Sequence, residues 1–265
     1  MTQLLFMAAL VGYIGTAGVR IIGARSVTLG RLADVCLWIG LLAHFAGLGH
    51  IAMEARALPV HTTAASVAFV GSVVGLGAGV TRLAARNTVL SGVVVAMAAV
   101  TLGVSMLLPQ QTPPEPTALA TFWLPFHVLG IFFGMASFAC AFAVSGTFLV
   151  VRKRLKAKDF AALGRLPSLD GLDKWNTRFV VIGFLTLTIG IATGGAWAAA
   201  RGGGSGLGPT VWITLVLWGW YAIAVLVRVV GQWRGRMAAL FSVVGFSGLV
   251  VSLSLVLLLL QGWHG

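Results

Sequence analysis

Hydrophobic residues occur along the chain in eight long runs that are separated by short polar connections. Each run has about 20 residues or more, and a helix of that length crosses about 30 Å of hydrocarbon. In lipid, backbone polar groups must be satisfied within the segment itself, which favours helices over open strands. The predicted fold class is therefore all-α, a polytopic membrane helix bundle. The runs cover residues 3–22, 34–53, 63–81, 89–108, 123–151, 178–199, 210–230 and 237–261.

Composition agrees with a chain that lies almost wholly in the membrane. It is 58% hydrophobic and only 9% charged, whereas soluble domains carry about 25% charged residues. The connections are too short for a separate soluble domain, so we expect residues 1–265 to form a single integral membrane domain. The first run has no basic segment before it and no small-residue cleavage site, so we interpret it as a retained helix.

The basic residues alternate between the two sides of the predicted bundle. All of the 18 Lys and Arg residues except Arg56 and Arg201 fall in every second connection. The positive-inside rule places these connections in the cytoplasm, so eight spans leave both termini non-cytoplasmic. Residues 109–116 then form an external loop, and 152–176 form the largest cytoplasmic connection. The net charge of +12 is explained by topology and by anionic lipid, and we expect no nucleic-acid partner.

The histidines fall toward the outer side in this topology. His44 is placed near mid-membrane, and His50, His61, His127 and His264 lie near the outer interface. Two neutral imidazoles that converge from different helices can hold one iron. His127 and His264 are the candidate pair, and His44 and His50 are further candidates as metal ligands. The alternative is a set of interfacial histidines that bind loops or water through hydrogen bonds.

Four tryptophans, Trp123, Trp197, Trp212 and Trp263, are also predicted near the outer interface. This position is typical of an aromatic belt. A second interpretation is an apolar shelf for a flat porphyrin beside the histidines. The six acidic residues lie mostly in loops or at helix ends. They form no buried carboxylate pair for acid–base chemistry, so we assign no catalytic residue.

Segments in the second half of the chain resemble the cytochrome c assembly family (CcsA/ResC, with its HemX-like relatives). Residues 166–198 read LPSLDGLDKWNTRFVVIGFLTLTIGIATGGAWA and look like the family segment leading into the helix before the haem-binding loop. Residues 123–128 (WLPFHV) are similar to the start of the helix whose histidine is an external haem ligand. Residues 261–265 (QGWHG) are similar to the C-terminal ending that carries the second external ligand.

The resemblance covers roughly residues 120–265, including WGWYAIAVLVRVVGQWRGRMAAL at 218–240. In the first half it rests on hydropathy and on LPVHTTAASVAF at 58–69. It implies haem handling for cytochrome c biogenesis in the bacterial plasma membrane, with another membrane protein as partner. By the same resemblance His127 and His264 are axial ligands of a non-covalent b-type haem. The apolar neighbours of that haem would be Trp123, Trp212 and Trp263.

Two departures from the family pattern change the expected activity. The Trp-rich loop W-G-x-x-W-x-W-D of the synthases is replaced by ARGGGSGLGPTVW at 200–212, where Trp212 is the only aromatic residue. The family's membrane-embedded histidine, five residues after a Tyr, corresponds to Leu226 when counted from Tyr221. We therefore expect a haem-binding protein rather than an enzyme. The alternatives are a HemX-like regulator or scaffold that docks through residues 152–176, or a small-solute transporter.

Overall fold

The computed structural model describes residues 1–22, 26–56, 58–60, 62–84, 88–109, 123–158, 166–200, 209–229, 231 and 233–262. These residues form helices and turns and contain no strand, which confirms the predicted all-α class. The helices are α1 (Thr2–Ile22), α2 (Val27–Ala55), α3 (Thr63–Ala84), α4 (Thr88–Leu107), α5 (Trp123–Lys156), α7 (Leu169–Ala200), α8 (Pro209–Val229) and α9 (Arg236–Gly262).

The helices match the predicted transmembrane runs. The seven helices from α1 to α8 are long and apolar enough to cross a membrane. The remaining helix, α9, is apolar over Arg236–Ser252, the part of it whose side chains are described. A polytopic membrane bundle is therefore confirmed.

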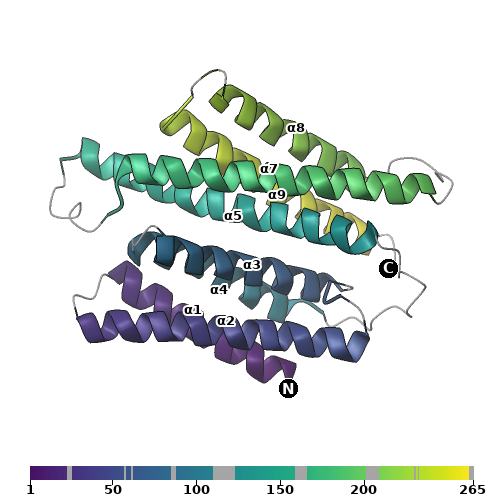
Figure 1. Cartoon of the computed structure of the whole chain (residues 1–265), viewed down its shortest axis with the longest axis horizontal. Helices are drawn as coiled ribbons and strands as arrows, with labels where there is room; N and C mark the ends of the chain where they lie inside the picture. The colour runs from purple at the N-terminus through teal and green to yellow at the C-terminus, as the bar shows by residue number, and fades with distance from the viewer. Residues whose placement is uncertain are drawn as a thin grey trace.

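The helices group into two halves (Figure 1). We call α1–α4 the N-terminal half and α5, α7, α8 and α9 the C-terminal half. In the first, α1 packs against α2 and α4, and α3 packs against α4. In the second, α5 packs against α7 and α9, and α8 packs against α9. The halves meet where α5 contacts α3 and α4. Contacts of α5 thus join the two halves. A single domain over residues 1–265 stays a prediction.

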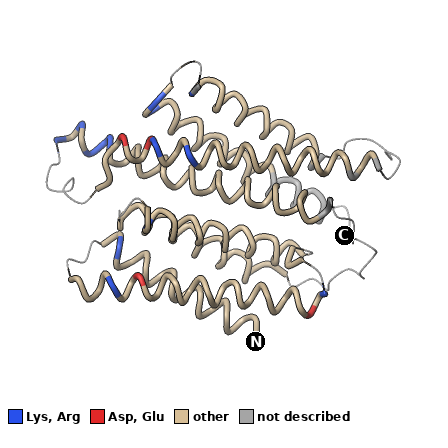
Figure 2. The backbone as a smooth tube through the Cα atoms, viewed as in Figure 1, with Lys and Arg blue, Asp and Glu red and all other residues tan. Residues whose placement is uncertain are grey.

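Successive helices run in opposite directions, so the starts of α1, α3 and α5 lie toward the same end as the end of α9 (Figure 1). Figure 2 shows that most described Lys and Arg residues gather at the other end. We call this the basic end, and it carries Arg20, Arg82, Arg154 and Arg228. Arg56 is the C-cap of α2, two positions after Glu54, and α2 ends toward the opposite end, as the charge alternation predicts (Figure 1). The cytoplasmic location of the basic end follows from the positive-inside rule and stays a prediction.

Glycines allow an unusually close approach between α5 and α7. A Cβ atom at Gly130 would lie 2.7 Å from the backbone nitrogen of Gly190, and one at Gly183 would lie 2.6 Å from the ring of Phe138. Both distances are shorter than van der Waals contact, so no larger residue fits without movement. In membranes, where packing drives helix association, small residues bring backbones together in this way. This seam between α5 and α7 positions the candidate site.

Candidate functional site

The C-terminal half holds His127 in the first turns of α5, in the seam with α7. The side chain is half-buried, and its Nδ1 lies 2.6 Å from the carbonyl oxygen of Gly190. A carbonyl oxygen only accepts hydrogen bonds, so Nδ1 must carry the proton and donate it. In the neutral ring, Nε2 then holds the lone pair. A hydrogen bond from Nδ1 to a backbone carbonyl is the arrangement that orients histidine ligands of metals.

Gly194 makes room for the imidazole of His127. A Cβ atom built at Gly194 would overlap the His127 ring at Nδ1 and Cε1. The neighbouring Gly195 has no atom within 4 Å of the same position. Only Gly194 therefore lies under the ring, and together with the Gly190 carbonyl it fixes the ring's place between the two helices. The close approach of α5 and α7 supplies both contacts.

The other residues predicted around the haem are described only in part. His264 and Trp263 lie outside the described residues, as do His61 and the side chain of Trp123. Trp212 is in the first turn of α8 and is 57% exposed. Since α9 ends at Gly262 toward the end where α5 begins (Figure 1), the topology is compatible with the pair. Ligation by His127 and His264 stays a prediction.

His44 lies in the core of the N-terminal half, away from the α5–α7 seam. It is fully buried, and its Nδ1 is 3.2 Å from the hydroxyl of Tyr13. The ring of Phe6 packs edge-on against it, with ring centroids 5.5 Å apart. Its Nε2 has no partner among the described atoms. The structure does not bring His44 and His127 together. His44 lies on α2 and His127 on α5, and the helices of the N-terminal half that contact α5 are α3 and α4.

His50 links the start of α1 to the last turn of α2. Its Nδ1 lies 3.0 Å from the hydroxyl of Thr2 and 3.2 Å from a carboxylate oxygen of Glu54. These contacts give His50 a local role at the opposite end from the basic residues. Among the described residues, no three His, Cys, Asp or Glu side chains group as a metal site. A haem iron needs only one or two axial ligands from the protein, so it does not require such a group of three side chains.

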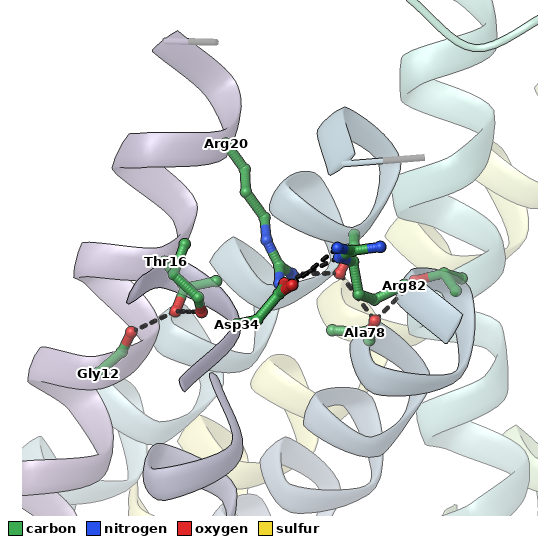
Figure 3. Close-up of polar contacts among 9 residues, drawn as sticks. Gly12, Thr16, Arg20, Asp34, Ala78 and Arg82 are labelled. Atoms are coloured by element: carbon green, nitrogen blue, oxygen red, sulfur yellow. Dashed lines mark hydrogen bonds and ion pairs between the residues drawn. The ribbon is translucent and has the colours of Figure 1, made fainter. Parts of the chain in front are cut away.

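A partly buried ionic network at the basic end of the N-terminal half was not predicted from the sequence (Figure 3). Asp34 of α2 accepts hydrogen bonds from Arg20 Nη2 at 2.5 Å and from Arg82 Nε at 2.8 Å. Arg20 Nη1 also donates to Ser91 Oγ at 2.6 Å, and Ser91 donates to the Ala78 carbonyl at 2.7 Å. One carboxylate thereby connects α1, α2 and α3, and the serine adds α4.

The C-terminal half has a similar network at the same end. Arg228 of α8 donates to a carboxylate oxygen of Asp173 in α7 at 2.6 Å. Arg228 also donates to Asn176 Oδ1 at 3.3 Å. The amide nitrogen of Asn176 donates to Ser242 of α9 at 3.1 Å and to Ser145 of α5. All four helices of this half are connected through these side chains.

The position counted as a lost membrane histidine faces away from the bundle. Leu226 is 60% exposed on α8, whereas Tyr221 is fully buried and stacks on Phe138 with centroids 3.5 Å apart. A histidine at 226 would therefore point away from the core of the bundle. An internal haem ligand at this position has no support in this fold.

Comparison with known proteins gives one family. The family model described as "Cytochrome C assembly protein" matches residues 33–264. This match reaches into the N-terminal half, beyond the 120–265 segment in which the sequence resemblance is best.

Several relatives carry the name "Cytochrome c biogenesis protein CcsA". The one from Chlamydomonas reinhardtii is 31% identical over 138 residues, which cover 52% of this chain and 38% of that protein. The one from Thermosynechococcus vestitus is 36% identical over 104 residues, covering 39% and 33%. The one from Prochlorococcus marinus (strain NATL2A) is 26% identical over 210 residues, covering 68% and 67%. The first two matches thus span about a third of each relative's length, 38% and 33%.

Proposed function

Because this chain belongs to the cytochrome c assembly protein family, we propose that it handles haem for cytochrome c biogenesis near the outer end of the bundle. The observation that supports this site is the geometry of His127, whose Nδ1 is bound to the Gly190 carbonyl. That bond leaves Nε2 as the only free lone pair of the neutral ring. An imidazole held in this way fits an axial ligand of haem iron.

In this proposal, His127 and His264 are the two axial ligands of a non-covalent b-type haem, and Trp123, Trp212 and Trp263 are its apolar neighbours. The bound haem would supply the iron and the porphyrin that an apocytochrome receives. The chain itself binds and orients. Its Gly190 carbonyl fixes the His127 tautomer, and the space at Gly194 lets the ring lie between the helices.

The surroundings of the site follow from the charge distribution. Basic residues at the end away from His127 favour a cytoplasmic location for that end, so the haem site faces outward (Figure 2). We place the protein in the plasma membrane of a bacterium, in contact with lipid and with another membrane protein of cytochrome assembly. No side chain is assigned to bond-making chemistry, so the role is binding and presentation rather than catalysis.

The test is haem titration of the purified full chain, followed by absorption at the Soret band. We expect the wild type to bind haem with the spectrum of a bis-histidine centre. His127→Ala and His264→Ala should each lose that spectrum, and added imidazole should restore part of it in His127→Ala. His50→Ala is the matched control, because His50 is held by Thr2 and Glu54 in the other half. A wild type without a Soret band, or an unchanged band in the His127/His264 double variant, contradicts the proposal.

A further inference from the structure

A groove lies between the two halves near the basic end. Its volume is about 640 Å³, within the range of about 300–1,000 Å³ that is usual for small-molecule sites. The end of α1, the first turns of α4 and the second half of α5 line it. Representative lining residues are Ile22, Val93, Met97, Phe142 and Val150.

The lining is apolar apart from two side chains, Thr147 and Arg154. The hydroxyl of Thr147 donates to the Ala143 carbonyl at 2.9 Å, so its hydrogen bond is already made within α5. Arg154 is exposed, and among the described residues it is the only charged residue of the lining. The groove thus offers an apolar compartment, and Arg154 is the cation in its described lining. This is the chemistry of an amphiphile with an acyl chain and an anionic head.

Charge complementarity selects the kind of amphiphile. The groove lies at the end where Lys and Arg gather, and Arg154 belongs to the basic run 152–156 at the end of α5 (Figure 2). Cytoplasmic leaflets contain anionic phospholipids, and basic pockets between transmembrane helices on that side bind their head groups. A zwitterionic lipid would leave Arg154 without net compensation.

We propose that this groove holds an acyl chain of an anionic phospholipid, with the lipid phosphate paired to Arg154. The chain of the lipid fills the space between α4 of the N-terminal half and α5 of the C-terminal half. The bound lipid therefore stabilises the contact between the halves. This site is separate from the proposed haem site, which lies at the other end of α5.

Gly146 gives a direct way to block the groove. It lines the groove, and a Cβ atom there meets nothing within 4 Å, so a larger side chain enters the space without displacing protein. Gly103 of α4 is the matched control, because its Cβ position is equally open and it does not line the groove. Both glycines are inside helices, so the gain in helix propensity on substitution by Leu is the same.

The experiment is native mass spectrometry of the delipidated full chain with phosphatidylglycerol or phosphatidylcholine of identical acyl chains. We expect wild type and Gly103→Leu to retain phosphatidylglycerol in preference, and Gly146→Leu to bind it about tenfold more weakly. Arg154→Gln should lower the preference for the anionic lipid about fivefold. Lys153→Gln, one position before and outside the lining, should leave the preference unchanged.

Three results overturn the proposal: equal binding of the two lipids by wild type, wild-type lipid binding by Gly146→Leu, or equal losses in Arg154→Gln and Lys153→Gln. The last would show attraction to the basic surface in general rather than to the groove. If Gly146→Leu does not fold, the comparison of Arg154→Gln with Lys153→Gln decides the matter alone. Circular dichroism confirms that each variant used is helical.

Discussion

In each half of the bundle, a polar network joins the helices at the basic end, and the two networks are similar. The environments of the histidines in the two halves differ. In the N-terminal half, Asp34 accepts from both Arg20 and Arg82. In the C-terminal half, Asp173 pairs with one arginine, Arg228, and also accepts from the backbone nitrogen of Gly235. The amide of Asn176 and its hydroxyl partners complete the network. Each half therefore has one acidic side chain on which several helices converge. Arg20 is the most buried of these arginines, at 2% exposed, whereas the carboxylate of Asp34 is more exposed than that of Asp173, at 29% against 18%.

The histidines show what distinguishes a core residue from a candidate ligand. His44 is enclosed by Tyr13 and Phe6 and is fully buried. His127 lies half-buried in a seam between two helices, where a backbone carbonyl fixes its tautomer. The acceptor, the Gly190 carbonyl, does not titrate and is held within helix α7, so it keeps the proton of His127 on Nδ1. The proposed haem ligand thus differs from the core histidine in the partner of its Nδ1 and in its burial.

The largest stability effect is expected from Asp34→Asn. Loss of the carboxylate leaves the Arg20 guanidinium buried without a counter-charge, which should cost about 3 kcal/mol of unfolding free energy. The control is Asp170→Asn, since the Asp170–Lys174 pair is 75% and 66% exposed and should contribute less than about 1 kcal/mol. Thermal unfolding in detergent measures both. Equal losses in the two variants would mean that the Asp34 network does not hold the N-terminal half.

Gly194→Ala tests the histidine of the C-terminal half without removing it. The new methyl group overlaps the His127 ring, and displacing an oriented ligand should weaken haem affinity about 10- to 100-fold. Gly195→Ala is the matched control, because the added Cβ meets nothing within 4 Å. Haem titration of both variants gives the measurement. Equal affinity in both would show that the seam does not set the ligand's position.

Asp173→Asn should have a smaller effect than Asp34→Asn. Arg228 then loses its charged acceptor, but it is 9% exposed and keeps Asn176 as a partner. The expected loss is about 2 kcal/mol, measured by the same unfolding assay. A loss larger than that of Asp34→Asn would reverse the order of the two networks.

Tyr13→Phe should have the smallest effect. It removes the hydroxyl that contacts His44 Nδ1, which should lower stability by about 1 kcal/mol. Haem titration should be unchanged, because His44 lies outside the proposed site. A loss of the Soret band in Tyr13→Phe would instead assign His44 to haem binding and remove the contrast between the halves.

Hydropathy predicted the helices well but not their bounds. The second run begins at residue 34, whereas α2 begins at Val27, because the Ser26 side chain accepts from Leu29 N and caps the helix. The sixth run begins at 178, whereas α7 begins at Leu169 after Ser168, which accepts from Gly171 N. Hydropathy detects the part of a helix in hydrocarbon, while backbone hydrogen bonding continues through the polar interface.

The candidate site was predictable only in part. His127 was identified because it starts an apolar run on the predicted outer side. Its acceptor, the Gly190 carbonyl, lies 63 positions away, and periodicity does not tell which helices pair. The spacing of Gly190 and Gly194 was an available signal, since small residues four apart favour close helix contact. For the same reason, the sharing of Asp34 by two arginines required the packed structure.

Asp34 has one negative charge for the two guanidiniums that it binds, so this cluster keeps one net positive charge at the edge of the bilayer (Figure 3). In the proposed orientation, that charge lies on the electrically negative side of an energised membrane. Moving it across would cost about 2.3 kcal/mol for each 100 mV of potential. The cluster that joins the first helices therefore also opposes inversion of the protein, and its contribution increases with the transmembrane potential.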